Sequence, residues 1–375
     1  MVKDISITDA LQMKDVCFVD VRSEGEFAEG SIPGAVNVPL FTNEERTAVG
    51  TTYKQLGTEE AKRLGLEIAS PKLPELFKDI AGLAKYKRVL LYCWRGGMRS
   101  KYTASVLNSL GLPVCRIQGG YKAYRRYVHR YLDREIIPHK SIVLHGLTGV
   151  GKTIVLQKLR ERFLPVLNLE TIARHRGSAY GKIGLPDSPS QKDFEAQIVQ
   201  ALVAAEEKGV IFVECESRRL GKLIVPTAIL NSMAGGYRVL LYASLQTRVS
   251  RIIDEYTQGP DHNIERLQFS TGLLKKSLGA RIVDDLNIKI AEKRFTEVIP
   301  YLLTHYYDPL YNYPDRPSED YDLSVDCEDL DSTADQLAHW VTTLPEYGVP
   351  VENGGESHVN RGSLEECADQ EGLFV

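Results

Sequence analysis

SIVLHGLTGVGKT, residues 141–153, joins a short apolar run to the pattern G-x-x-x-x-G-K-T. Glycines in such a loop let the backbone curl until its N–H groups face a phosphate, while the lysine reaches the terminal phosphates and the threonine hydroxyl can bind Mg2+. The apolar strand before the loop and an amphipathic helix expected over 154–163 support this interpretation. The sequence therefore predicts a phosphate- or diphosphate-binding loop, with Thr153 as the candidate magnesium ligand, formed by Gly146, Gly149, Val150, Gly151, Lys152 and Thr153.

A second buried strand, GVIFVECES (209–217), ends in the carboxylates of Glu214 and Glu216. P-loop proteins place an acid that orients Mg2+ or a water at this position, although both could simply be satisfied strand-end carboxylates. A strand–helix unit over 237–256 presents Arg248 and Arg251 as candidate phosphate contacts. With a last strand and a capped helix between 321 and 344, these elements predict an α/β domain of the P-loop NTPase type over residues 140–345.

Two further stretches of this domain contain candidate binding residues. ETIARHRGSAYGKIG (170–184) has no apolar period and predicts a loop at the mouth of the phosphate site, where Arg174, His175 and Arg176 could bind an anionic substrate or simply face solvent. THYYDPLYNYPDRP (304–317) contains four tyrosines that could stack on bases or line an apolar pocket, with core packing expected for at least two of them.

The N-terminal third alternates short strands with helices, which predicts a doubly wound sheet. The apolar run before YCWRGGMRS (92–100) places Cys93 at the carboxyl end of a strand, in a loop that feeds a helix. Backbone N–H groups, the helix N-terminus and the side chains of Arg95 and Arg99 would favour the thiolate and hold an anion beside it. We therefore expect a functional thiol at Cys93, whereas the sequence around the cysteines at 17, 115 and 215 predicts buried structural thiols.

The charge distribution is uneven along the chain. Residues 318–375 hold 15 acidic residues and one arginine, so the first 317 residues carry a net charge of +10 within a whole-chain value of -4. Such a body can attract a polyanion. The densest basic run predicts a linker helix over 121–139, either simply solvated or in contact with nucleic acid, with tyrosines between its basic residues Lys122, Arg125, Arg126, Arg130 and Arg134.

Composition narrows the class of protein. A chain of 375 residues, 43% hydrophobic and 26% charged, is typical of a soluble protein with two or three domains. No segment approaches the roughly 18 apolar residues of a membrane span, and no signal sequence is visible, so a cytoplasmic protein without membrane contact is expected. Six cysteines without a CxxC pair predict neither a disulfide framework nor a zinc site. The acidic residues 346–375 are expected to form a disordered tail.

Three motifs resemble a known family. VDVRSEGEFAEGSIPGAVNVP, CWRGGMRS and RIQGGYKAYRRY resemble the opening, active-site and closing motifs of a rhodanese domain, here assigned to residues 1–130. Rhodanese-like domains carry sulfur or selenium on the cysteine or, in an arginine-closed form, act as phosphatases. A rhodanese domain joined to a P-loop domain, with CWRGGMRS, GLTGVGKT and ARHRGSAYG together, resembles the bacterial tRNA 2-selenouridine synthase family over residues 5–345.

That resemblance implies a cytoplasmic transferase that acts on tRNA carrying a wobble 2-thiouridine. The thiouridine sulfur first displaces diphosphate from geranyl diphosphate, and selenium from selenophosphate then replaces the S-geranyl group. No tightly bound organic cofactor is implied, Mg2+ could take part, and an enzyme that supplies selenophosphate is an expected partner. Cys93, Arg95, Arg99 and Lys152 are the candidate catalytic residues. Cys93 could relay selenium as a perselenide or accept the phosphoryl group.

Two other readings of the same residues remain open. The P-loop domain could be an ATP-dependent small-molecule kinase fused to a sulfurtransferase, in which case ATP turnover would depend on Lys152. A non-catalytic RNA-binding module is the third alternative; it would bind tRNA without changing it.

Overall fold

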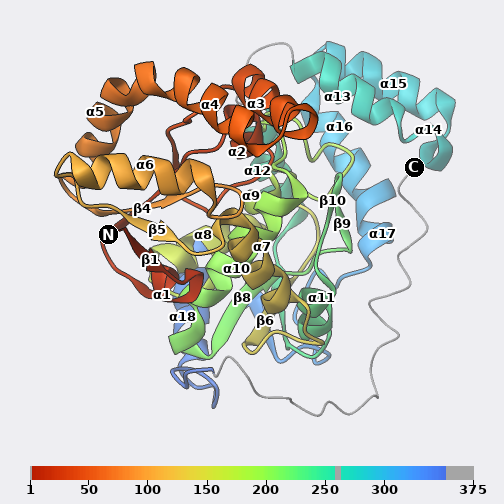
Figure 1. The fold of residues 1–375 in the computed structure, drawn as a ribbon. Helices are drawn as coiled ribbons and strands as arrows, with labels where there is room; N and C mark the ends of the chain where they lie inside the picture. The colour runs from red at the N-terminus through yellow and green to blue at the C-terminus, as the bar shows by residue number, and fades with distance from the viewer. Residues whose placement is uncertain (1, 258–262, 352–375) are drawn as a thin grey trace. The chain divides into compact units, whose positions relative to one another are not determined.

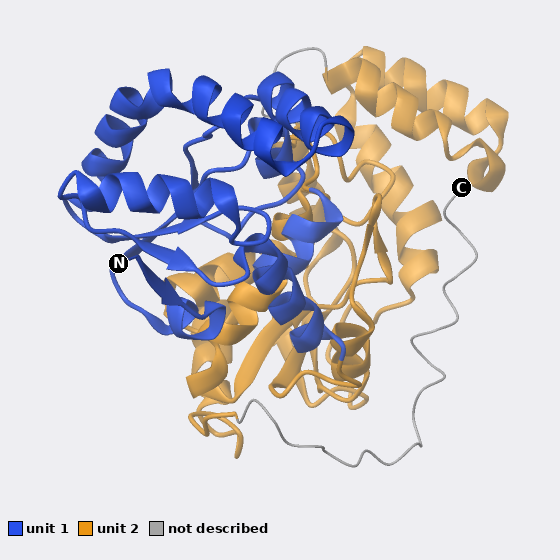
Figure 2. Cartoon of the chain, viewed as in Figure 1, with its two compact units in different colours: residues 1–133, 190–197 blue, residues 134–189, 198–375 orange. Residues whose placement is uncertain are grey.

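The computed structural model describes residues 2–257 and 263–351 (Figure 1). The chain divides into two compact units, one of residues 1–133 and 190–197 and one of residues 134–189 and 198–375 (Figure 2). Each unit is built on a five-stranded sheet whose strands pair in parallel. The predicted fold class, a doubly wound rhodanese-like part followed by a P-loop α/β part, is confirmed.

The sheet of unit 1 has the strand order β1-β5-β4-β2-β3. Its central strand β4 is a short apolar run that is buried on both faces from Val89 to Tyr92, as expected for a parallel sheet covered by helices. Val19, Leu91 and Ile80 are fully buried in the core that forms between the sheet and the helices. The strands are β1 (Lys3–Ile5), β2 (Val16–Asp20), β3 (Val36–Asn37), β4 (Arg88–Tyr92) and β5 (Cys115–Ile117).

The helices of unit 1 begin at residues whose side chains or backbone suit a helix start. Ser6 and Thr42 accept hydrogen bonds from the third residue after them, and Thr42 forms a capping box with Glu45. Gly119, at φ 75°, lets the chain turn directly from β5 into α7. The helices are α1 (Ile7–Gln12), α2 (Glu24–Ala28), α3 (Asn43–Gln55), α4 (Thr58–Ala69), η1 (Ser70–Lys72), α5 (Leu73–Ala84), α6 (Met98–Ser109) and α7 (Gly120–Leu132).

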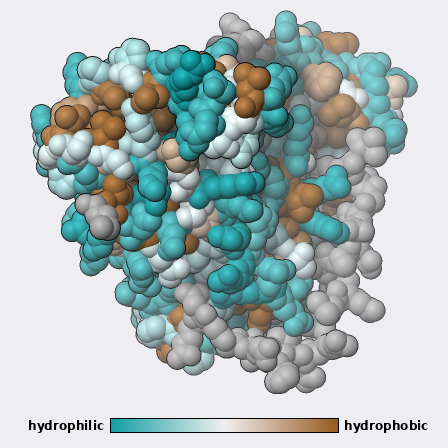
Figure 3. Space-filling view, viewed as in Figure 1, coloured by the Kyte–Doolittle hydropathy of each residue, from teal (hydrophilic) through white to brown (hydrophobic). Residues whose placement is uncertain are grey.

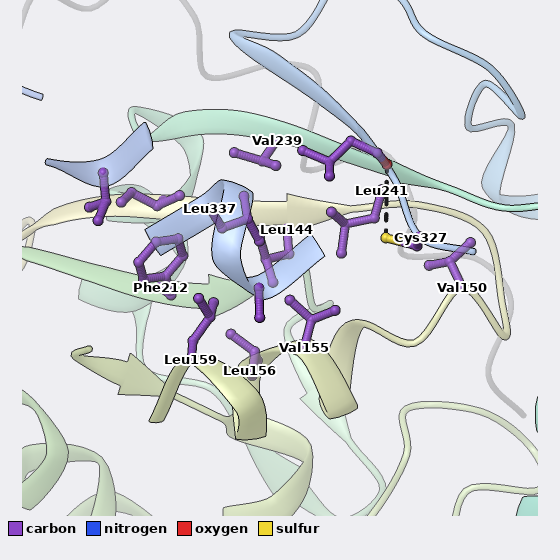
Figure 4. Packing of buried hydrophobic residues seen from close by; sticks show 14 of the residues in the cluster. Leu144, Val150, Val155, Leu156, Leu159, Phe212, Val239, Leu241, Cys327 and Leu337 are labelled. Atoms are coloured by element: carbon purple, nitrogen blue, oxygen red, sulfur yellow. Dashed lines mark hydrogen bonds between the residues drawn. The ribbon is translucent and has the colours of Figure 1, made fainter. Parts of the chain in front are cut away.

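The sheet of unit 2 has the order β12-β11-β6-β8-β7, which places β6 at its centre. Leu144, Phe212 and Leu241 on the strands pack against Leu156 of α8 and Leu337 of α18 (Figure 4). The strands are β6 (Lys140–His145), β7 (Val166–Leu167), β8 (Val210–Glu214), β11 (Tyr237–Tyr242) and β12 (Leu323–Asp326), and a separate antiparallel pair is formed by β9 (Arg219–Leu220) and β10 (Leu223–Ile224).

Three of the helices around this sheet, α8, α12 and α18, lie where the sequence predicts them, and the others were not predicted. The helices are α8 (Lys152–Glu161), α9 (Leu169–Ala173), α10 (Gln191–Ala204), η2 (Glu206–Lys208), α11 (Thr227–Ala234), α12 (Leu245–Thr257) and α18 (Leu330–Val341). Asp329 caps α18 by accepting from two backbone N–H groups. Helix α10 begins with residues assigned to unit 1 and ends in unit 2.

A helical region inserted before β12 has its own hydrophobic core, with Val283, Leu286 and Val298 buried. It contains α13 (Asn263–Gly272), α14 (Lys275–Leu278), α15 (Ala280–Ala291), α16 (Phe295–Leu302), the π-helical turn η3 (Leu303–Tyr307) and α17 (Asp308–Tyr311). Hydrophobic side chains also reach the surface over α13 and α15, where Phe269 is 71% and Ile288 58% exposed (Figure 3).

Three expectations about local structure need correction. The basic helix ends at Leu132 rather than at 139, because Asp133 already leaves the helical backbone, at φ −81° and ψ 44°. Further on, Pro138 disfavours helical backbone at Ile137, whose N–H bonds to the hydroxyl of Ser232 instead. The stretch 170–184 is not loop throughout, since its first residues belong to α9.

Residues 346–351, expected to belong to a disordered tail, are part of the fold. The N–H groups of Gly348 and Val351 donate to the carbonyls of Lys208 and Glu206, so the chain is still held there; residues 352–375 of the expected tail lie outside the described residues. Among the described residues, no helix is long and apolar enough to cross a membrane.

Candidate functional site

The loop between β6 and α8 has the backbone that the glycine pattern predicts. Gly146, Gly149 and Gly151 have φ values of 143°, 85° and 97°. A Cβ on Gly146 would lie 2.3 Å from the carbonyl oxygen of Leu241, and one on Gly149 would lie 2.9 Å from that of Arg248. The Lys152 ammonium donates to the Gly146 carbonyl over 2.7 Å and so folds across the loop. The loop therefore has the shape that cradles phosphates, with a cation beside it.

Three glutamates gather next to this loop. The Thr153 hydroxyl donates to Glu170 over 2.9 Å, and the Glu170 N–H donates to Glu214 over 2.8 Å. Burial and the charge of Glu170 raise the pKa of Glu214 to about 8, and burial with the charges of Glu170 and Glu214 raises the pKa of Glu216 well above its usual value. Glu214 is 1% exposed, and its Oε2 has no hydrogen-bond partner among the described residues.

The residues present fit a magnesium ion only in part. Thr153, Glu214 and Glu216 supply hydroxyl and carboxylate oxygens, the ligands that Mg2+ prefers. In the described part of the chain, however, no group of three or more His, Cys, Asp or Glu side chains is arranged to hold a metal ion. An ion here would therefore need oxygens from a bound phosphate, as is common for Mg2+.

Two arginines of α12 brace the loop from outside rather than facing a phosphate. Arg248 donates from Nε to the carbonyl of Thr148 over 2.8 Å, and Arg251 donates to the carbonyl of Val150 over 2.8 Å. Both guanidinium groups are thus engaged with backbone oxygens of the loop, which corrects their expected role as phosphate contacts.

The predicted anion-binding residues 174–176 are largely committed to internal bonds. Arg176 forms an ion pair with Glu255 at 2.5 Å, donates to the carbonyl of Ile183 and lies over the ring of Tyr256. Nδ1 of His175 accepts from the N–H of Gly177, and burial with the charges of Lys182 and Arg176 lowers the pKa of His175.

Arg174 is the exposed member of the three. It donates to the carbonyl of Asp187 over 3.0 Å and has a left-handed backbone, at φ 52°. Of the three predicted residues, Arg174 is therefore the best placed to meet a ligand, and Arg176 stabilises the loop.

Three tyrosine rings stack in a row in unit 2, which we call the tyrosine ladder, and a histidine ring meets its end. The rings of Tyr307 and Tyr311 are nearly parallel at 6.4 Å, those of Tyr311 and Tyr313 are parallel at 6.2 Å, and Tyr313 meets His145 edge-on at 5.6 Å. The Tyr313 hydroxyl donates to Cys215, which lies between Glu214 and Glu216. Burial, followed by the charges of Glu216 and Glu170, raises the pKa of Tyr311. The ladder therefore reaches the three glutamates.

In unit 1, Cys93 follows β4 as predicted and lies in the loop that precedes the N-terminus of α6. Cys93 as a residue is 3% exposed, and its Sγ lies 3.3 Å from the hydroxyl of Ser100. The loop packs tightly against the turn before α7: a Cβ on Gly120 would lie 2.2 Å from the Cys93 carbonyl, and the N–H of Tyr121 donates to that carbonyl. Cys93 is thus more buried than expected, whereas Cys115 and Cys215, expected to be buried, are partly exposed.

The arginines of this loop have different environments. Arg95 is exposed, whereas Arg99 donates to both carboxylate oxygens of Glu26 at 2.6 and 3.1 Å. Burial alone would raise the pKa of Glu26, but the bonds and charge of Arg99 outweigh it and lower that pKa. Arg116, which the sequence did not single out, donates to the carbonyl of Gly96 and is held by Asp4. The paired Arg99 therefore stabilises the loop through Glu26.

The basic helix α7 presents only part of its charge to solvent. Lys122, Arg126 and Arg130 are exposed at a spacing of four residues. Arg125 is 9% exposed and forms an ion pair with Glu195 at 2.6 Å within the same unit. Arg125 is therefore removed from the candidate tRNA contacts, while Arg134 lies beyond the end of the helix.

Comparisons with known proteins match both parts of the chain to family models. Residues 139–333 match the model of the tRNA 2-selenouridine synthase AAA domain, and residues 6–127 match that of the rhodanese-like domain. The chain belongs to the tRNA 2-selenouridine synthase family. A tRNA 2-selenouridine synthase of Nitrosomonas europaea is 39% identical over 68% of this chain and 67% of its own length. Those of Nitrosomonas eutropha and Hydrogenovibrio crunogenus are each 35% identical and are covered over 89% and 91% of their lengths.

Several residues at the sites of this synthase-family chain had no signal in the sequence. Glu170 follows Thr153 by seventeen positions without a motif, and only the fold brings its carboxylate to the Thr153 hydroxyl. Arg116 lies on a strand expected to be structural. The tyrosines from 306 to 313 did form a visible cluster, but the sequence could not show that their rings stack toward Glu214 and Glu216.

Proposed function

We propose that this enzyme converts wobble 2-thiouridine of tRNA to 2-selenouridine in two transfers, first of a geranyl group from geranyl diphosphate and then of selenium from selenophosphate. The observation that carries the proposal is the pairing, in one chain of this family, of a formed phosphate-binding loop with a cysteine loop of the rhodanese type. The first site suits a diphosphate leaving group and the second the transfer of selenium from selenophosphate.

In the first transfer, the thiouridine sulfur forms a bond to C1 of the geranyl group, the C–O bond to diphosphate breaks, and the N3 proton of the base is lost. The backbone N–H groups of the loop and the Lys152 ammonium would stabilise the charge that develops on the diphosphate. Thr153, with Glu214 and Glu216, would hold an Mg2+ ion, which would add positive charge at the same leaving group. Arg174 is the candidate anion contact in the neighbouring loop.

The tyrosine ladder supports a prenyl diphosphate over a nucleotide as the ligand of this loop. It offers stacked ring faces that reach the glutamates beside Thr153. Burial of a ten-carbon chain against such rings is favourable in proportion to the apolar area removed from water. A diphosphate in the loop and a geranyl chain along the ladder would therefore use both features.

In the second transfer, selenium from selenophosphate bonds to C2 of the base and the C–S bond to the geranyl thiol breaks. S-geranylation helps because the group that departs is then a thiol. Cys93 would act in this step, beside the exposed Arg95, as the acceptor of the phosphoryl group. Its thiolate would attack phosphorus, the P–Se bond would break and leave selenium on C2, and water would then release phosphate from the cysteine. The Lys122, Arg126 and Arg130 face of α7 would supply sequence-independent tRNA contacts.

The test is mass spectrometry of nucleosides from thiolated tRNA incubated with the protein and geranyl diphosphate, and then with selenophosphate. We expect S-geranyl nucleoside without ATP, and none with Lys152→Ala. Consumption of ATP that depends on Lys152, with the nucleosides unchanged, would favour a kinase fused to a sulfurtransferase. Binding of tRNA with no reaction under either condition would favour an RNA-binding module.

A further inference from the structure

A concave groove lies in unit 1 where α1 packs against α7. Its volume is about 350 Å3, and the two helices that form it contact each other directly. The side chains that line it come from the start of α1 and from successive turns of α7. They are Ile7, Thr8, Ala123, Arg126, Tyr127 and Arg130.

The charge of the groove comes from Arg126 and Arg130, which are one helical turn apart and both exposed. Within residues 2–257 and 263–351, neither guanidinium has a hydrogen bond or ion pair, in contrast to Arg125 of the same helix, which is paired with Glu195. Like charges at this spacing repel each other weakly. An anion between them would remove the repulsion and bond to both, and phosphate suits guanidinium geometry best.

The rest of the groove is aromatic and apolar. Tyr127 is half-buried and tilted by 50° against the buried ring of Tyr131, at a centroid distance of 6.4 Å. Ile7 and Ala123 add aliphatic surface. The nearby carboxylate of Asp9 accepts a hydrogen bond from the hydroxyl of Ser6. Proteins bind unpaired nucleotides with an aromatic ring flanked by basic side chains, because the base stacks on the ring while the phosphate binds the cations.

We propose that this groove binds an unpaired nucleotide of the tRNA, with its phosphate on Arg126 and Arg130 and its base against Tyr127. This inference rests on the proposed function only in taking RNA as the substrate. Helix α7 starts at the Cys93 loop, where the N–H of Tyr121 donates to the Cys93 carbonyl. At 1.5 Å per residue, the groove lies about 10 Å along the helix from that loop. A nucleotide held there would keep its neighbours in the RNA close to Cys93.

The experiment measures binding of a fluorescent anticodon stem–loop RNA by anisotropy at several salt concentrations, without geranyl diphosphate or selenophosphate. For the double variant Arg126→Gln/Arg130→Gln, the slope of log affinity against log salt should become shallower by about 0.7, the value for one phosphate of a single strand, because both arginines bind the same phosphate. Tyr127→Ala should weaken binding between about fivefold and 150-fold, whereas Tyr127→Phe should not. A charge-matched control, Lys54→Gln/Lys78→Gln, removes two exposed lysines of α3 and α5 and should have little effect.

A blunt RNA duplex of equal charge, used as a competitor, should displace the stem–loop poorly, because its bases are not available for stacking. The proposal is overturned if the two double variants lose equal affinity, if Tyr127→Ala binds as the unchanged protein does, or if the duplex competes fully. The binding assay measures no chemistry, so it tests the groove separately from the proposed reaction. Groove-dependent binding, together with unchanged nucleosides in the reaction assay, would support the groove and overturn the proposed reaction. Normal conversion of the nucleosides, together with binding that does not depend on the groove, would support the reaction and overturn the groove.

Discussion

Arg248 and Asp308 form a two-point ion pair, with guanidinium nitrogens 2.5 and 3.1 Å from the two carboxylate oxygens. The same guanidinium donates to the carbonyl of Thr148 in the phosphate-binding loop. Arg248 is 2% exposed, and Asp308 begins α17, the helix that contains Tyr311. One buried cation thus connects the loop to the helix that carries part of the tyrosine ladder.

Breaking this pair should cost stability and loosen the loop. Asp308→Asn leaves the buried Arg248 without a counter-charge, which we expect to lower the free energy of unfolding by about 3 kcal/mol. Adding Arg248→Met should restore part of that loss, and chemical denaturation of the single and double variants measures this coupling. As a control, Glu297→Gln breaks an exposed pair with Arg294 and should barely move the midpoint. Equal effects of Asp308→Asn and Glu297→Gln would contradict the assigned role of the pair.

Replacement of Glu170 by glutamine should raise the stability of the protein and lower its activity. The charge of Glu170 helps to raise the pKa values of Glu214 and Glu216, so Glu170→Gln removes repulsion and should raise the melting temperature at pH 8. The same change weakens the acceptor that holds the Thr153 hydroxyl, and geranyl transfer should fall about 10- to 100-fold. Thermal melts and nucleoside analysis check both effects against Glu161→Gln, an exposed acid at the end of α8. Lower stability together with unchanged transfer would count against this role.

The stability of unit 2 should fall on acidification because of His145. Burial, with the charges of Arg238 and Lys152, lowers the pKa of His145 from 6.5 to about 3. Between these values the unfolded chain binds the extra proton, so stability is lost as the pH falls below 6.5, by about 1.4 kcal/mol per pH unit at most. His145→Phe should flatten melting temperature against pH between 6.5 and 5, whereas His305→Asn, at an exposed histidine, should not. Burial also lowers the pKa of His139 to about 4, so part of the pH dependence of the melting temperature should remain in His145→Phe. If the slope of melting temperature against pH is unchanged in His145→Phe, the pH dependence does not come from His145.

The tyrosine ladder should select the length of the prenyl chain. Tyr311→Ala and Tyr313→Ala remove ring faces from a geranyl chain but leave the diphosphate contacts intact, so KM for geranyl diphosphate should rise about tenfold, for a loss of roughly 1.4 kcal/mol of apolar contact. KM for dimethylallyl diphosphate, with a chain half as long, should change less. Tyr86→Ala, at a residue 84% exposed in unit 1, is the control. Equal changes in KM for both diphosphates would mean that the geranyl chain does not bind along the tyrosine ladder.

The sequence predicted the elements that repeat a local pattern. The strand, glycine loop and helix around Lys152, the strand ending at Glu214 and the strand before Cys93 are where the apolar runs and glycines placed them, because these features act over a few residues. The orientation of arginines could not be predicted in the same way. The residues next to Arg125 and Arg176 in the sequence do not distinguish them from arginines that face solvent. Only partners distant in the sequence, Glu195 and Glu255, turn them inward.

The helical region from 263 to 311 is the largest part of the fold that was not predicted from the sequence. Its core residues, such as Val283 and Val298, are buried against helices of the same region, so no strand or glycine motif marks it. Glu170 illustrates the corresponding limit at the site. A single acid has no periodicity, and its role depends on the approach of α9 to the start of α8, where Thr153 lies.

The central claim is that geranyl transfer and selenium transfer use different sites of one chain, and a bypass experiment tests it most directly. S-geranylated anticodon stem–loop RNA, prepared chemically, is given with selenophosphate to Lys152→Ala, Cys93→Ala and the control Cys115→Ala. We predict that Lys152→Ala and Cys115→Ala produce 2-selenouridine from this RNA, whereas Cys93→Ala does not, although Cys93→Ala still geranylates thiolated RNA. If Lys152→Ala fails on the geranylated RNA, or if Cys93→Ala converts it, the two-site account is contradicted.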